Sequence, residues 1–72
     1  MKHNMRLDID KVMILLAERG LSYKAFCKKA HTTEMEFRYI RNGIRRPKPL
    51  TIGKFATTLG VEVKDIIIQE GD

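Results

Sequence analysis

Residues 21–42, LSYKAFCKKAHTTEMEFRYIRN, carry the signals of two short helices joined by a tight turn, and this stretch most constrains the fold. Ser22 is a good N-cap residue, so the first helix is expected from Ser22 to Lys29. The turn is then expected through Ala30, His31 and Thr32. A helix of about two turns is marginal by itself, so the rest of the chain must hold it by packing.

The second helix of this pair is expected to begin at Thr33 and to run to about Arg41. Thr33 and Glu36 match a capping box, in which the Thr33 hydroxyl accepts from the Glu36 amide and the Glu36 carboxylate reaches back to the Thr33 amide. Phe37 and Ile40, three positions apart, are expected to point inward. Gly43 is expected to end the helix.

Apolar residues at helical spacing predict further helices on both sides of this pair. Residues 8–19 have such a face, with Asp8 as N-cap, and residues 50–59 have another; the apolar residues are Ile9, Val12, Met13 and Leu16, then Ile52, Phe55, Ala56 and Leu59. A fifth, short helix is expected over residues 63–68, where the β-branched residues leave a strand as the alternative. The expected architecture is one all-α domain of five helices over residues 8–68, with an N-terminal arm (1–7) and a C-terminal tail (69–72).

The positive charge of the chain is confined to its middle. Residues 19–54 hold ten basic and two acidic residues, whereas residues 1–18 are neutral and residues 55–72 hold one basic and four acidic residues. A basic segment within a chain of net charge +5 suggests a polyanionic partner. The alternative is a basic surface that is merely solvated, and charge alone does not choose between the two.

The run from about residue 8 to residue 67 resembles the lambda-repressor/Cro-like (XRE-type) helix-turn-helix family. The matching residues are, in order, Gly20-Leu21-Ser22, Ala30, Thr33, Ile40, Asn42-Gly43, Pro47 or Pro49, Ala56, Leu59-Gly60-Val61 and Asp65. The resemblance implies a compact DNA-binding domain with its helix-turn-helix at the second and third helices. It also implies a sequence-specific regulator of transcription, most often a repressor of a phage, a mobile element or a bacterial operon.

Such a regulator is expected to act as a homodimer on double-stranded DNA, because one recognition helix reads only a few base pairs. The apolar residues 63–68 are a candidate dimer surface, and core packing is the alternative. Two other functions stay open: a protein-interaction module on the same scaffold, and a DNA-bending accessory or excision factor of a mobile element. The protein-interaction module is favoured by the unusual start of the helix that begins at Thr33, Thr-Glu-Met-Glu. On DNA, its two carboxylates would lie beside phosphates, which repel them.

Two further residues depart from the family pattern. Tyr23 stands where the family has a glutamine that commonly hydrogen-bonds a phosphate, so a contact there would come from the tyrosine hydroxyl. His31 stands in the turn where glycine is favoured. A left-handed backbone at that position costs more for histidine than for glycine.

The resemblance and the charge pattern together predict which side chains meet DNA. Phosphate contacts are expected from Lys24, near the start of its helix, and from Arg45, Arg46 and Lys48 in the loop after the recognition helix. A solvated basic loop is the alternative for those three loop residues.

Sequence readout is expected from the side chains of residues 33–39, which include Thr33 and Tyr39. Glu34 and Glu36 could accept from the amine of cytosine, and Met35 could touch a thymine methyl group. The local alternatives are a capping box for Glu36, a favourable position at the positive helix end for Glu34, and an exposed or partly packed side chain for Met35.

Arg38 and Tyr39 lie beyond the first turn of the recognition helix, where either could meet a base edge or a phosphate. Arg38 could instead pair with Glu34, four positions earlier. Tyr39 could instead pack its ring on the preceding helix.

Other functions receive little support from the residues. Cys27 and His31 are four positions apart, but a metal site needs three or four ligands and no second Cys/His cluster exists. No nucleophile, base and orienting group form an evident set, so no enzyme and no cofactor are expected. A single cysteine and the lack of a long apolar segment favour a reducing, cytoplasmic setting without a membrane span. A separate small-molecule effector domain is not expected.

Overall fold

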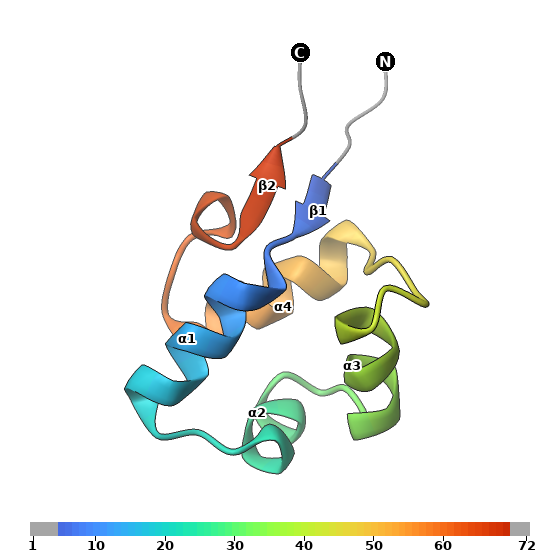
Figure 1. Ribbon diagram of the computed structural model, residues 1–72. Coiled ribbons are helices and arrows are strands. Elements are labelled where there is room, and N and C mark those ends of the chain that lie inside the picture. The colour runs from blue at the N-terminus through green and yellow to red at the C-terminus, as the bar shows by residue number, and fades with distance from the viewer. Residues whose placement is uncertain (1–4, 70–72) are drawn as a thin grey trace.

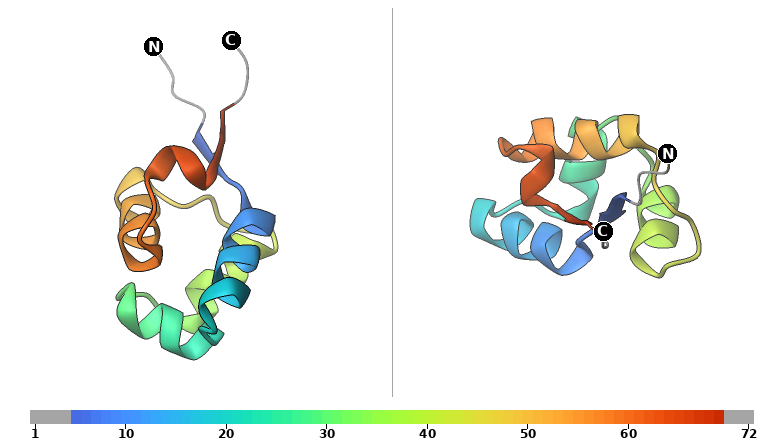
Figure 2. Two further views of the ribbon diagram at one scale, coloured as in Figure 1. Left: turned by 90° about the vertical axis from the view of Figure 1, so that its left-hand side faces the viewer. Right: turned by 90° about the horizontal axis from the view of Figure 1, so that it is seen from above.

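A computed structural model describes residues 5–69, and four α-helices make up most of this region. They are α1 (Ile9–Arg19), α2 (Tyr23–Lys29), α3 (Glu34–Arg41) and α4 (Pro49–Leu59). A one-turn 3-10 helix, η1 (Val63–Asp65), follows, and two strands, β1 (Met5–Leu7) and β2 (Ile67–Gln69), pair with each other. Seen from above, α1 and α4 lie along opposite sides of the domain, and α3 lies at one end (Figures 1 and 2).

The helices begin at the residues whose side chains can cap them. Asp8 accepts from the amide of Lys11, at 3.1 Å, in front of α1. Ser22 accepts from the amide of Ala25, also at 3.1 Å, in front of α2. These caps satisfy amides that have no partner inside the helix, and they confirm the predicted starts of the first two helices.

The expectation of five helices is wrong at the C-terminal end. Residues 63–68 do not form one helix: Val63–Asp65 make a 3-10 turn, Ile66 is fully buried, and Ile67 enters β2. The physical reason is tertiary, because β1 offers this β-branched segment a strand to pair with. The fold is mostly helical with a small antiparallel sheet, rather than all-α.

The sheet pairs segments from near the two ends of the chain. Residues 5–7 were expected in the N-terminal arm. They form β1 instead and pair with β2 in the register Met5↔Gln69, Arg6↔Ile68 and Leu7↔Ile67. The amide of Asp8 donates to the carbonyl of Ile66, at 2.8 Å, and so joins the sheet to the start of α1. The rest of the expected arm (1–4) and of the expected tail (70–72) lies outside the described residues.

Three phenylalanines form the centre of the core and tie α2, α3 and α4 together. The ring centroids of Phe26 and Phe37 are 5.4 Å apart, those of Phe26 and Phe55 are 5.1 Å apart, and those of Phe37 and Phe55 are 5.7 Å apart. All three side chains are completely buried. Aromatic pairs at such distances and tilts add to the stabilisation from burial, so α3 is held firmly through Phe37.

The predicted inward faces of the long helices are confirmed. The core contains Val12, Leu15 and Leu16 of α1, Phe37 and Ile40 of α3, and Ile52, Phe55, Ala56 and Leu59 of α4. Ile9 and Met13 pack against this core from its edge. Within the described residues no helix has the length and apolar character needed to cross a membrane.

Candidate nucleic-acid interface

The turn between α2 and α3 sets the angle of the second helix. The amide of Thr32 donates to the carbonyl of Cys27, at 2.9 Å, and His31 adopts a left-handed backbone with φ of 57°. Among the described residues, His31 is the non-glycine residue with positive φ, at the turn position where the family favours glycine. Such a conformation is strained for a side chain with a Cβ, so packing on both sides must hold it.

The first turn of α3 is capped by Thr33, and half of the predicted capping box forms. The Thr33 hydroxyl accepts from the Glu36 amide, at 3.0 Å. The Glu36 carboxylate does not complete the box; it accepts instead from Nη1 of Arg45, at 2.7 Å. The carboxylate is therefore neutralised by the loop that follows the helix, which the sequence alone did not indicate.

Arg45 also covers an aromatic ring. Its guanidinium carbon lies 5.7 Å from the ring centroid of Tyr39, and the Arg45 amide donates to the Tyr39 carbonyl, at 3.2 Å. Tyr39 is half-buried, and one of its partners is this arginine of the following loop. Glu36, Tyr39 and Arg45 form one cluster, named here the loop clamp, which ties the loop to α3.

A second contact joins the two helices of the motif. The Tyr23 ring packs edge-on against Phe37, at 5.2 Å between centroids, and the Tyr23 hydroxyl accepts from Nη1 of Arg41. The Arg41 guanidinium carbon lies 5.2 Å from the Tyr23 centroid. The hydroxyl expected to meet a phosphate is therefore already engaged with an arginine.

Three side chains of α3 remain on its outer surface: Glu34, Met35 and Arg38. Met35 is 57% exposed. No ion pair within 4.0 Å joins Arg38 to Glu34 among the described residues, so the alternative of a local pair is wrong. These side chains are available for an external partner.

Exposed basic residues stand before and after this helix in the chain. Lys24 lies near the start of α2, and Arg46 and Lys48 lie in the loop between α3 and α4. Lys48 occupies the N-cap position of α4 without a side-chain cap, and Pro49 begins that helix. Proline at the first helical position restricts the backbone, so the basic loop joins α4 rigidly.

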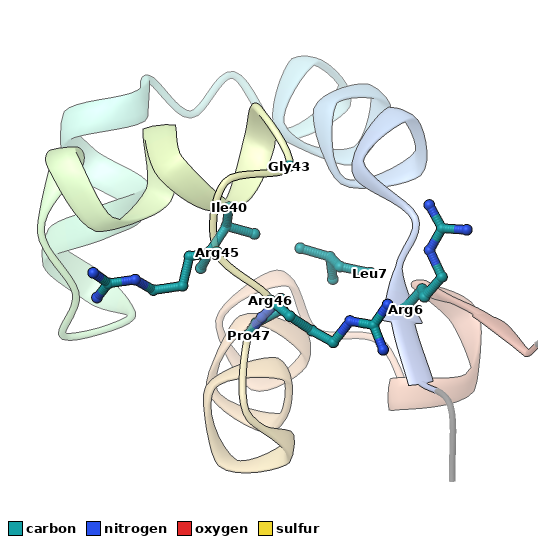
Figure 3. A pocket seen from close by; sticks show the side chains of 7 residues that line it. All are labelled: Arg6, Leu7, Ile40, Gly43, Arg45, Arg46 and Pro47. Atoms are coloured by element: carbon teal, nitrogen blue, oxygen red, sulfur yellow. The ribbon is translucent and has the colours of Figure 1, made fainter.

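Sequence reasoning missed two arginines. Arg41 was predicted only as the end of its helix, and its contact with Tyr23 depends on the crossing of α2 and α3. Arg6 lies in β1, yet it lines a surface hollow that Arg45 and Arg46 also line (Figure 3). No local sequence signal could place a residue of the N-terminal strand beside a loop nearly forty positions later.

The cysteine and histidine of the turn do not share a site. Cys27 is buried in the core, whereas His31 is exposed. Burial raises the pKa of the Cys27 thiol, and the nearby Glu34 carboxylate raises it further. In the part of the chain that the structure describes, no three metal-binding side chains gather.

The fold is similar to that of a solved regulatory protein. It matches the crystal structure of the restriction-modification controller protein C.AhdI from Aeromonas hydrophila with a TM-score of 0.72 and 21% sequence identity. The match covers 78% of this chain and 85% of that one. No family model matches the sequence, and no curated protein matches it. The structural match shows that the two proteins share a fold.

Proposed function

We propose that this protein is a sequence-specific DNA-binding regulator of transcription, most simply a small repressor. The observation that carries the proposal is the outer face of α3. This short helix is anchored by Phe37 and exposes Glu34, Met35 and Arg38, and exposed basic side chains stand in the preceding helix and in the following loop. A helix-turn-helix with that arrangement suits the major groove, since the groove admits one helix and phosphates lie on either side of it.

The proposed contacts divide into two groups. Lys24, Arg46 and Lys48 would bind phosphates and position the domain, with a smaller part for Arg45 because it is shared with Glu36. Residues of the first turns of α3 would specify sequence: Glu34 by accepting from cytosine and Met35 by contact with a thymine methyl group. Glu36, Tyr39 and Tyr23 would act mainly by holding α3 and the basic loop in place, with Thr33 as the cap.

The likeness to a restriction-modification controller protein supports a regulatory function. We propose that the protein acts in the cytoplasm as a homodimer, because one recognition helix contacts too few base pairs for a specific site. Of the apolar residues 63–68, Ile66 is buried and Ile68 is 46% exposed, so Ile68 is what remains for a dimer contact.

Binding to short duplexes of random sequence at several salt concentrations tests the proposal. Each phosphate contact should contribute about −0.9 to the slope of log affinity against log salt. Lys48→Gln should weaken binding to all sequences alike and flatten the slope. Selection from random DNA should instead show an altered preferred sequence for Met35→Ala. Absence of binding at low salt would refute the DNA-binding function.

A protein-interaction module is the second candidate, and the exposed apolar side chains favour it. Met35 on α3 is 57% exposed, and Ile44 in the following loop is 69% exposed. Exposed apolar side chains of this kind would be available to a protein partner, whose binding surfaces include contiguous apolar patches. The same salt titration separates the two candidates, because an apolar interface would leave the protein indifferent to DNA at any salt concentration.

A further inference from the structure

Arg41, the last residue of α3, reaches back to the first residue of α2. Its Nη1 donates to the Tyr23 hydroxyl, and its guanidinium carbon lies 5.2 Å from the centroid of the Tyr23 ring. The two helices are neighbours in Figure 1, and Tyr23 begins the helix that precedes α3. The contact therefore places a positive charge of the recognition helix beside the first turn of α2.

Tyr23 is itself held by two other contacts. Its ring meets that of Phe37 edge-on, with 82° between the ring planes, and its hydroxyl donates to Sδ of Met13, at 3.7 Å. Phe37 is completely buried, so the Tyr23 ring stands on the core. Because the hydroxyl gives its proton to Met13 and its oxygen to Arg41, Tyr23 has no proton left for a phosphate.

The charge of Arg41 is not neutralised within the described part of the chain. No carboxylate among residues 5–69 forms an ion pair with its guanidinium, whereas Arg45 is paired with Glu36, at 2.7 Å. A guanidinium has several N–H donors, and the Tyr23 hydroxyl accepts from one nitrogen. Since the Arg41 side chain is exposed, its remaining donors are available to an anion.

The contact with Tyr23 also orders the guanidinium before any ligand binds. An arginine side chain loses rotational freedom when it binds, and that loss opposes binding. The hydroxyl and the ring of Tyr23 hold Arg41 by a hydrogen bond and a cation–π contact. Less freedom therefore remains to be lost than for an arginine on a free loop.

The place of Arg41 suits a phosphate of the DNA backbone. When the second helix of a helix-turn-helix lies in the major groove, the first helix crosses the backbone. Lys24, which follows Tyr23 in α2, is exposed and is already assigned to a phosphate in the proposed function. Arg41 adds a second cation at this end of α2, and its planar fork of donors matches the oxygens of a phosphate.

We propose that Arg41 binds one phosphate of the DNA backbone and that Tyr23 positions its guanidinium. This site depends on the proposed DNA-binding function, and it extends the phosphate contacts to the C-terminal end of α3. Tyr23 acts on the phosphate through the arginine rather than through its own hydroxyl.

Arg41→Gln tests the phosphate contact, and Lys64→Gln is the matched control. Both variants lose one positive charge, but Lys64 belongs to η1, which adjoins β2 at the end of the domain remote from α2 (Figures 1 and 2). On a short random-sequence duplex, Arg41→Gln should make the salt slope less steep by about 0.9, so its loss of affinity should be about threefold larger at 50 mM than at 200 mM salt. Arg41→Lys should restore the slope because it keeps the charge, and Lys64→Gln should leave the slope unchanged.

Tyr23→Phe tests the positioning, because it removes the hydroxyl and keeps the ring. It should weaken binding by about two- to tenfold at an unchanged slope, since the charge of Arg41 remains but its side chain must now be ordered on binding. The same change should have no effect on DNA affinity in the Arg41→Gln protein. Equal losses in both proteins would overturn the positioning by Tyr23.

An Arg41→Gln slope equal to that of a DNA-binding wild type would overturn the phosphate site alone. Failure of the wild-type protein to bind DNA at low salt would instead refute the proposed function, and this site with it. A measurement without variants follows the Nε–H resonance of Arg41 in the isotope-labelled protein. It should shift with the duplex and stay in place with inorganic phosphate at the same ionic strength; an equal shift with inorganic phosphate would overturn the assignment to the DNA backbone.

Discussion

Glu36→Gln is expected to strengthen binding to DNA, although it removes a charged residue from the recognition helix. In the loop clamp the Glu36 carboxylate occupies Nη1 of Arg45, at 2.7 Å. The two side chains are 30% and 56% exposed, so solvent screens the pair and its coupling energy should be about 0.2–1 kcal/mol. Breaking the pair therefore costs little stability and releases one arginine for a phosphate.

The effect on DNA binding follows from one additional phosphate contact. Such a contact should steepen the salt slope by about 0.9, so the advantage of Glu36→Gln over the wild type should fall about threefold between 50 and 200 mM salt. Arg45→Ala should weaken binding and leave an unpaired carboxylate facing DNA, and the double variant Glu36→Gln/Arg45→Ala should recover part of that loss. The resulting double-mutant cycle isolates the coupling between the two residues.

Fluorescence anisotropy with a short random-sequence duplex measures all four proteins of the cycle. Glu18→Gln is the matched control, because Glu18 is an exposed glutamate of α1 whose contact with Arg19 is long, at 3.8 Å. A drop in affinity for Glu36→Gln, together with a changed preferred sequence in selection from random DNA, would refute the reasoning. That result would mean that Glu36 reads a base rather than holding Arg45.

Three further outcomes are expected. Phe37→Ala should lower the free energy of unfolding by about 3–5 kcal/mol, which is close to the whole stability of so small a domain. A loss below about 1 kcal/mol in urea unfolding would contradict this expectation. His31→Gly should raise stability by about 0.5–1 kcal/mol, since glycine relieves the left-handed strain at φ of 57°, and a lower melting temperature would contradict this. The pKa of the Cys27 thiol is raised in the folded protein, so folding favours the neutral thiol. The stability that this contributes is fully present below the ordinary pKa of 9.0 and is lost as the pH rises through the pKa of the folded state. Cys27→Ala should therefore show a smaller alkaline loss of stability in urea unfolding across that range, and equal losses would refute the assignment.

Local signals predicted the helical part of the fold well. The caps at Asp8, Ser22 and Thr33 form as expected, and the inward positions Phe37 and Ile40 are buried. Capping and amphipathic spacing act within one or two turns, so neighbouring residues in the sequence contain the information. The outward positions of the helix-turn-helix could be predicted for the same reason.

The candidate site was predicted less completely, because its side chains interact across elements. Glu36 had a local partner available in the Thr33 amide, yet the folded loop brings Arg45 to it instead. From the sequence, the Tyr23 hydroxyl was expected to be available to a phosphate. The crossing of the two helices brings Arg41 to that hydroxyl instead. A surface pair gains little energy, so the choice between such partners depends on which groups the fold brings close.

The sequence by itself determined where the four α-helices begin, which faces they bury, and that a basic segment surrounds the second helix of the pair. Tertiary structure decided the conformation of residues 63–68, since Ile67 and Ile68 belong to a strand that pairs with residues 5–7. It also brought Arg6 to the basic loop and Arg45 to Glu36. The physical reason is the range of the interactions: hydrogen bonds within a helix are local, whereas strand pairing and charge clusters join segments that meet only after the chain has folded.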